Sequence, residues 1–294
     1  MKENKKLKKD LKFLKKVKLD VEASPEDERD YTIDKMKRRK AQRAKKVELP
    51  KSYQSNLTMI LNQGIIGSCV AHSLASYLMV QDTVHLDNKF NDYSRGYIYG
   101  NRAMTDAQSE GMHIRQALAQ LLKCGDVLYE DFPYNLRYPT VSSLIAKNRK
   151  ELKEKAYKYR ITNYFRVFGI DQIKECVYNT GACVIRIPIY SNFCSNAHPF
   201  ERGKDKFEGY HAVIIVGWTE DNRWIIQNSW GKRWGYEGLG YMDFDYRIDE
   251  AWGISFDSEH EIKEQPSKFQ IFLKGLINFI KCLFKKKEKE TIDK

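Results

Sequence analysis

Three side chains of this sequence could together carry out acyl transfer to a thiol. Cys69 begins the apolar run 69–80, which is predicted to be a buried helix with Ser68 as its N-cap. Unpaired N–H groups and the helix dipole at a helix start favour an anion, so the Cys69 thiol is expected to ionise more readily than a free thiol. A thiolate is the nucleophile that acyl transfer needs.

Such a nucleophile needs an imidazole to share its proton and a third group to hold that imidazole. His211 lies near the start of a strand predicted over 210–218, and Asn228 lies on the strand predicted over 223–230. Residues 219–222 indicate a hairpin-like turn between them, and neighbouring antiparallel strands can bring an imidazole and an amide together. The amide would orient the ring without adding charge.

Each of these residues also has an ordinary structural explanation. Cysteine is among the most often buried residue types, so Cys69 alone would be read as a core residue. His211 could be a hydrogen-bonded core histidine, and Asn228 could be a turn residue. Only the combination favours catalysis.

Several stretches of the sequence carry a resemblance to a known family. The stretch NQGIIGSCVAHS, residues 62–73, resembles the active-site segment of the papain-like cysteine proteases, usually NQGxCGSCWAFS. Gln63 stands six residues before Cys69, as the glutamine does there. YHAVIIVGW and WIIQNSWGKRWGYEGLGYM resemble that family's His and Asn-Ser-Trp-Gly segments, and EGMHIRQALAQLLKCG followed by EDFPY resembles the middle of bacterial and viral-type members.

The resemblance implies a role for each matched residue. Gln63 would donate its side-chain amide to the oxyanion, with the backbone N–H of Cys69 as the second donor. Trp230 would cover the hydrogen bond between His211 and Asn228. The implied activity is a thiol-dependent (endo)peptidase with a Cys-His-Asn triad and a thioester acyl-enzyme, acting on protein or peptide substrates without cofactor or metal. The alternative is an inactive papain-like binding or scaffold module, tethered to a membrane or partner by its C-terminal helix.

The sequence also departs from the family pattern beside the nucleophile. Ile66 stands where the family usually has a disulfide-forming cysteine, Val70 replaces the usual Trp, and His72 replaces a common Phe. These replacements leave the proton-transfer groups intact, so we expect activity to be kept and substrate preference to differ.

The elements that must position these residues change in type along the chain. The first half is helical in pattern, with a second helix predicted over 111–125 and stopped by Gly125. The second half is rich in Val, Ile, Tyr and Phe, with further strands predicted over 161–168, 182–190 and 239–244 and a short helix over 171–180. We therefore predict an α+β protein; the resemblance implies a papain-like fold of two lobes, one helical and one an antiparallel β-barrel-like lobe, with the active site in the cleft between them.

The positive charge of the chain is concentrated at its ends. Of a formal net charge of +12, residues 1–46 hold 18 Lys and Arg against 9 Asp and Glu, and residues 268–294 hold 8 against 3. The body between them is nearly neutral, which does not indicate a nucleic-acid groove. The ends are expected to contact an anionic membrane, an acidic surface or this protein's own body.

These patterns predict three segments along the chain. The first looks like an appendage, in which Ser24-Pro25 could open a helix; it is either a solvated basic arm or, as the resemblance suggests, a pro-region that inhibits the enzyme by lying across the cleft. The predicted segments are the basic arm 1–48, the peptidase domain 49–258 with a helical lobe at about 49–160 and a β lobe at about 161–258, and an amphipathic basic tail 259–294.

The tail has the composition of an interfacial amphipathic helix. Its apolar residues recur at helix spacing before a Lys run: Phe269, Phe272, Leu273, Leu276, Ile280 and Leu283. This face could rest on an anionic membrane surface, or dock on the body or a partner subunit, and the sequence leaves both open.

The sequence also gives an expectation about location. The start has no apolar run long enough for a Sec signal peptide, and no stretch reaches the length needed to span a bilayer. The six cysteines form neither CxxC pairs nor metal-ligand spacing, which favours a reducing compartment. We expect a cytoplasmic or virion-associated protein, or one held peripherally at a membrane.

Overall fold

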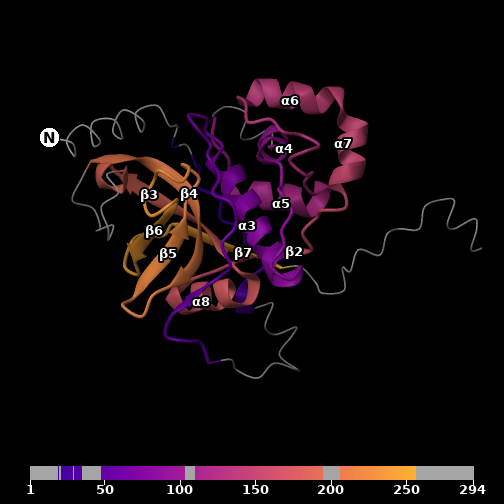
Figure 1. Ribbon diagram of the computed structural model, residues 1–294. Coiled ribbons are helices and arrows are strands. Elements are labelled where there is room, and N and C mark those ends of the chain that lie inside the picture. The colour runs from indigo at the N-terminus through magenta and orange to yellow at the C-terminus, as the bar shows by residue number, and fades with distance from the viewer. Residues whose placement is uncertain are drawn as a thin grey trace, which may run out of the picture. The chain divides into compact units, whose positions relative to one another are not determined.

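The computed structural model of the protein describes residues 19, 21–28, 30–34, 48–102, 110–194 and 206–255 (Figure 1). The basic start at 1–18 and the predicted amphipathic tail 259–294 lie outside these residues. Within the described part of the chain, no helix combines the length and apolar character that crossing a membrane requires.

The first half of the described chain is helical, as the sequence predicts. The structure confirms the two predicted helices, as α3 (Cys69–His85) and α5 (Ile114–Cys124), the second ending at Gly125 with a positive φ of 75°. Three further helices were not predicted: α4 (Arg95–Gly100), α6 (Tyr138–Lys147) and α7 (Arg149–Ala156).

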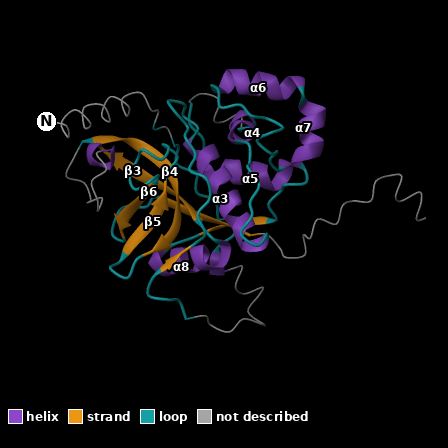
Figure 2. Cartoon of the chain, in the orientation of Figure 1, coloured by secondary structure: helices purple, strands orange, loops and turns teal. Residues whose placement is uncertain are grey.

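The second half forms an antiparallel sheet with one helix, α8 (Gly169–Thr180). The strands follow the order β2-β7-β3-β4-β5-β6, with β1 paired to β4. Helices α3 to α7 lie together beside the strands, while α8 lies against the sheet (Figure 2), and with the antiparallel sheet this confirms the predicted α+β class. The strands are β1 (Tyr53–Gln54), β2 (Asn163–Arg166), β3 (Cys183–Tyr190), β4 (Phe207–Trp218), β5 (Arg223–Gln227), β6 (Leu239–Asp243) and β7 (Glu250–Ser255).

Helix α3 packs directly on the sheet. Its apolar and small residues are buried on all sides, as the lack of a polar face in the sequence predicts. Ser73 donates its hydroxyl to the carbonyl of Ala212 on β4 at 2.8 Å. Gln81, two turns later, donates to the carbonyl of Ile254 on β7 at 2.8 Å. These bonds fix α3 along the sheet, with its second turn held at the middle of β4.

The described residues between 19 and 34, here called the strap, are packed against the body. The N–H of Tyr210 donates to the carbonyl of Leu19 at 3.3 Å, and Nε of Arg186 donates to the carbonyl of Val21 at 3.0 Å. Val21 is only 3% exposed. The N–H of Ser24 donates to a carboxylate oxygen of Glu250 at 2.5 Å. The strap therefore crosses β3, β4 and β7 through hydrogen bonds to its main chain.

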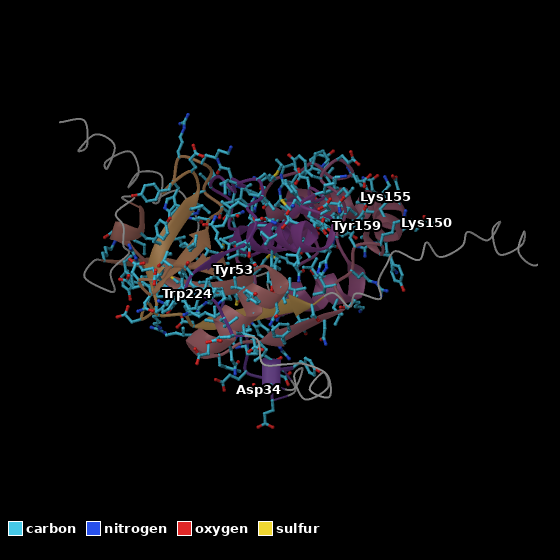
Figure 3. All side chains as sticks on the ribbon, turned by 60° about the horizontal axis from the view of Figure 1, so that its bottom comes forward. Asp34, Tyr53, Lys150, Lys155, Tyr159 and Trp224 are labelled. Carbon is cyan, nitrogen blue, oxygen red and sulfur yellow. The ribbon has the colours of Figure 1, made fainter. Side chains whose placement is uncertain are left out.

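The second part of the strap is held by ion pairs between side chains and by a buried apolar side chain. Arg115, in the first turn of α5, contacts Asp30 at 2.5 Å and Asp27 at 2.7 Å. Ile33 is 1% exposed and belongs to the apolar core of the sheet, while Asp34 beside it projects outward (Figure 3). This part of the predicted appendage is thus integrated into the folded body.

The predicted helix opening at Ser24-Pro25 is wrong. Residues 21–27 and 30–32 have no helical conformation, and helical residues begin only at Ile33. The reason is tertiary: the N–H and hydroxyl of Ser24 are bonded to Glu250 and to the N–H of Arg115, respectively. These contacts replace the local bonds that would start a helix.

Candidate active site

The segment that leads into α3 is paired with the segment that follows β5. The N–H of Gln63 donates to the carbonyl of Ser229, and the N–H of Gly231 donates to the carbonyl of Leu61, both at 2.9 Å. Asn62 and Trp230 face each other across this short antiparallel pairing. Residues from the helical and the β half of the chain are thereby held side by side.

A tight turn then delivers the cysteine to the start of α3. Gly64 has a φ of 63°, a conformation that favours glycine. Gly67 passes so close to residue 110 that an added Cβ would lie 2.9 Å from the carbonyl oxygen of Glu110. Cys69 follows as the first residue of α3 and is 1% exposed. Small residues in this turn are therefore a steric requirement.

Ser68 is the N-cap residue, as predicted, but its side chain makes no capping hydrogen bond. Its hydroxyl instead lies 3.2 Å from Nδ1 of His72, and the same nitrogen lies 2.9 Å from the carbonyl oxygen of Ser68. A carbonyl can only accept, so Nδ1 of His72 carries a proton. Complete burial lowers the pKa of His72 to about 3, which keeps this core histidine neutral.

His211 and Asn228 meet, as the predicted hairpin requires. The turn over 219–222 joins β4 to β5, and Nε2 of His211 lies 2.8 Å from Oδ1 of Asn228. The N–H of Ser229 also donates to Oδ1 at 2.7 Å, which identifies this atom as the amide oxygen. Nε2 must therefore carry a proton, and in the neutral ring Nδ1 is an acceptor.

The imidazole of His211 is enclosed. The ring is fully buried, and Trp230 stacks on it with centroids 4.8 Å apart and planes tilted by 30°. Among the described residues, Nδ1 has no hydrogen-bond partner. Burial lowers the pKa of His211 to about 4, and the hydrogen bond with Asn228 opposes this shift. The ring is thus neutral near pH 7, with a free lone pair able to accept a proton.

Helix α3, which begins at Cys69, is bonded to the strand that carries His211. Ser73 lies one helical turn after Cys69 on the same helix face, and it bonds to Ala212, the residue after His211. The structure therefore holds the second turn of α3 at the middle of β4, beside the residue that follows His211.

Gln63 is fully buried, and both ends of its side-chain amide are held. The hydroxyl of Ser229 donates to Oε1 at 2.7 Å, while Nε2 donates to the carbonyl of Ile66 at 2.9 Å. An amide nitrogen has two N–H bonds, so one remains for a ligand. Ser229 was not singled out from the sequence, although its place between Asn228 and Trp230 is the signal that could have identified it.

Comparisons with known proteins point to one family. The family model described as "Papain family cysteine protease" matches residues 44–261. An uncharacterised peptidase C1-like protein of Acanthamoeba polyphaga mimivirus is 27% identical over 216 residues, covering 67% of this chain and 68% of its own. A viral cathepsin of Heliothis zea nuclear polyhedrosis virus is 27% identical over 209 residues, and a cysteine protease of Blomia tropicalis is 28% identical over 212. These matches cover 66% and 65% of this chain, but only 52% and 59% of the two relatives.

Solved structures show the same fold. Xylellain, a cysteine protease from Xylella fastidiosa, has a TM-score of 0.67 at 23% identity, covering 82% of this chain and 97% of its own. The procathepsin B S9 of Trypanosoma congolense has a TM-score of 0.65 at 15% identity, covering 84% of this chain and 89% of its own. At these identities the likeness concerns the fold alone.

The buried His72 gives a prediction about pH. Its folded pKa of about 3 lies below the ordinary 6.5, so only the unfolded chain binds this proton between those values. The stability that it contributes is present above about pH 6.5 and lost as the pH falls towards 3. We expect His72→Phe to remove this loss, which amounts to roughly 4 kcal/mol between pH 7 and pH 3.

Urea unfolding at a series of pH values measures this effect. Between pH 7 and pH 3, the unfolding free energy of the wild-type chain should fall more steeply than that of the variant. Parallel curves for the two proteins would show that the pKa of His72 is the same in the folded and unfolded states, which would contradict the prediction.

Proposed function

We propose, since the chain belongs to the papain family of cysteine proteases, that it is a thiol-dependent peptidase with Cys69 as nucleophile and His211 as general base. In the same proposal Asn228 orients the imidazole, and Gln63 donates to the oxyanion. The observation that carries the proposal is the pairing of His211 with Asn228, which leaves a buried, unprotonated Nδ1 on β4, the strand to which α3 is bonded.

The proposed chemistry is acyl transfer in two stages. Cys69 gives its proton to Nδ1 of His211, and its sulfur bonds to the carbonyl carbon of the peptide. The tetrahedral intermediate collapses as His211 returns the proton to the leaving amine, which breaks the C–N bond. Water then attacks the thioester with His211 as base, releasing the carboxylic acid and restoring the thiol.

Asn228 and Trp230 support the charged state that this transfer creates. A buried imidazolium is costly, and the low pKa of His211 expresses that cost. The hydrogen bond from Nε2 to Asn228 favours the charged ring, since it acts to raise the pKa. A thiolate formed at Cys69 would add a second stabilising partner, because opposite charges attract strongly where water is excluded.

Gln63 and the N–H of Cys69 are the proposed oxyanion donors. The carbonyl oxygen gains charge in the tetrahedral intermediate, and preorganised donors stabilise it without reorganisation. The support comes from Ser229, which holds Oε1 of Gln63 and so fixes which end of the amide carries the N–H bonds.

The assignment of Cys69 gives a direct test. Cys69→Ala should abolish hydrolysis of fluorescently labelled casein while leaving the far-UV circular dichroism and melting temperature close to wild type. Cys124→Ala, a half-buried cysteine on α5, is the matched control and should keep activity.

Either of two results would contradict the proposal. Full activity in Cys69→Ala would remove the nucleophile assignment. A properly folded wild-type chain that neither hydrolyses casein nor reacts covalently with the epoxide E-64 at Cys69 would favour the inactive scaffold.

The strap supports a proposal of self-inhibition. It lies as an extended chain beside β4, with its Leu19 carbonyl bonded to the N–H of Tyr210, the residue before His211. An extended main chain bound in this place resembles a peptide substrate in chemistry. In this proposal, the strap occupies part of the surface that the substrate needs.

Loosening the strap should therefore raise activity. Val21→Gly removes a buried side chain worth about 1.5 to 3 kcal/mol. We expect at least a tenfold higher rate of casein hydrolysis at equal enzyme concentration. Glu26→Ala changes an exposed strap residue and serves as the control. Equal activity of Val21→Gly and wild type, with an intact N-terminus by mass spectrometry, would remove the self-inhibition proposal.

Two proposals concern the ends and the location of the protein. The amphipathic pattern of the tail, residues 268–294, supports contact with an anionic membrane surface or with a partner. Flotation with phosphatidylserine vesicles distinguishes the two. Flotation of the full chain that is lost without these residues indicates membrane contact, and no flotation of the full chain indicates a partner. The viral origin of some relatives favours virion association, as an alternative to a cytoplasmic location.

A further inference from the structure

Arg186 is a buried cation close to the proposed base, and the chemistry above gives it no role. It lies on β3 directly opposite Ala212 of β4, one residue from His211. Only 6% of its surface is exposed. Burying an arginine raises the free energy of the folded state unless several contacts compensate for its lost hydration. The position of Arg186 therefore calls for an explanation.

Two contacts fix the guanidinium in place. Nη1 forms an ion pair with Asp249 at 2.9 Å, and the group stacks over the ring of Tyr210 at 3.5 Å from its centroid. A planar guanidinium held on its edge and on its face has a fixed direction for each of its N–H bonds. Nε therefore presents a preorganised donor.

That donor is occupied by a main-chain atom of the strap. Nε of Arg186 donates to the carbonyl of Val21 at 3.0 Å. The neighbouring contacts to the strap are of the same kind: the N–H of Tyr210 binds the Leu19 carbonyl, and Glu250 accepts from the N–H of Ser24. The body thus recognises the strap through its main chain, a mode of recognition that any extended peptide can satisfy.

We infer that Arg186 is a substrate-binding residue, whose Nε donates to a main-chain carbonyl of the peptide substrate once the strap has left. This inference rests on the proposed function, in which strap and substrate compete for one surface. When the strap leaves, Arg186 keeps Asp249 and Tyr210 but loses the acceptor of its Nε. An arriving extended peptide supplies a carbonyl that replaces it.

The arginine side chain suits this task better than lysine would. Asp249 takes one edge of the guanidinium and leaves Nε to point at the peptide. An ammonium has one nitrogen, which cannot serve both partners in the same geometry. A hydrogen bond from a charged donor is worth enough to change peptide affinity by roughly 10- to 100-fold.

The competing explanation is that Arg186 only ties β3 to the segment before β7 through Asp249. In that case, removing Asp249 would have the same effect as removing Arg186. If Arg186 binds substrate, neutralising Asp249 should change peptide affinity far less than replacing Arg186 does, because the amide oxygen of Asp249→Asn still accepts from Nη1 and the Tyr210 ring still supports the guanidinium.

The experiment uses the full-length chain with Val21→Gly, so that the strap competes less. Arg186→Lys, Arg186→Gln and Asp249→Asn are each added to it. The kcat and KM of each protein are measured with one internally quenched decapeptide that the wild-type chain cleaves. Arg186→Lys and Arg186→Gln should raise KM roughly 10- to 100-fold with kcat within about threefold. Asp249→Asn removes the charge but keeps an oxygen that accepts from Nη1, so the guanidinium stays in place and KM should change by less than about threefold.

A second measurement addresses the carbonyl itself. Each amide of the decapeptide outside the cleaved bond is replaced in turn by a CH₂–NH unit, which lacks the acceptor. One replacement should raise KM for the Val21→Gly protein and have little further effect when Arg186→Gln is also present. This non-additivity identifies the bonded carbonyl, and a purely structural arginine would not produce it.

Three outcomes overturn the inference, and they separate it from the proposed function. Activity retained by Cys69→Ala would remove the peptidase assignment itself. Unchanged activity in Val21→Gly would remove the shared surface on which the inference rests. Suppose that Cys69→Ala is inactive and Val21→Gly is more active, as expected. If the Arg186 variants then keep the KM of the Val21→Gly protein, or Asp249→Asn raises KM as much as they do, only the role of Arg186 is wrong.

Discussion

The short antiparallel pairing of residues 61–63 with residues 229–231 is the constraint on which the site depends. It consists of two main-chain hydrogen bonds of 2.9 Å, with Asn62 facing Trp230 between them. The same pairing places Gln63 against Ser229 and sets the direction in which the chain enters α3. Residues more than 160 positions apart in the sequence thus share one local framework. Because these bonds join main-chain atoms, they fix positions independently of the catalytic side chains.

A second feature of the site is that its two histidines, His72 and His211, are buried and neutral. His211 lies under Trp230, and burial lowers its pKa to about 4. His72, one turn from the nucleophile, is kept neutral by the same effect. The neutral imidazole of His211 can therefore accept the proton of Cys69, and this transfer creates a thiolate and an imidazolium together. The buried charge of Arg186 is compensated locally. Its guanidinium forms an ion pair with Asp249, stacks on Tyr210 and donates to a strap carbonyl.

The sequence predicted the α+β class, the papain-like fold and the meeting of His211 with Asn228, because each depends on local patterns or on a family motif. The predicted helix at Ser24-Pro25 failed because contacts between distant segments decide the conformation there, and the same contacts tie the strap to the body. The ion pairs of Arg115 with Asp27 and Asp30, and the burial of Ile33, join segments far apart in sequence. The hydrophobic periodicity of a sequence does not indicate such contacts. Arg186 was overlooked for the same reason, since a lone arginine in an apolar strand reveals nothing of its partners. The catalytic roles themselves remain proposals.

The most direct test of this account is the rate at which iodoacetamide alkylates Cys69 as a function of pH, with Cys124 of the same chain as an internal reference. A thiol that shares its proton with the imidazole of His211 should form a thiolate well below the ordinary cysteine pKa of about 8.5. We therefore expect Cys69 to react faster than Cys124 at pH 6. Alkylation of Cys69 that begins only near pH 8.5, at the rate of an ordinary thiol, would show that the two side chains do not form the proposed pair.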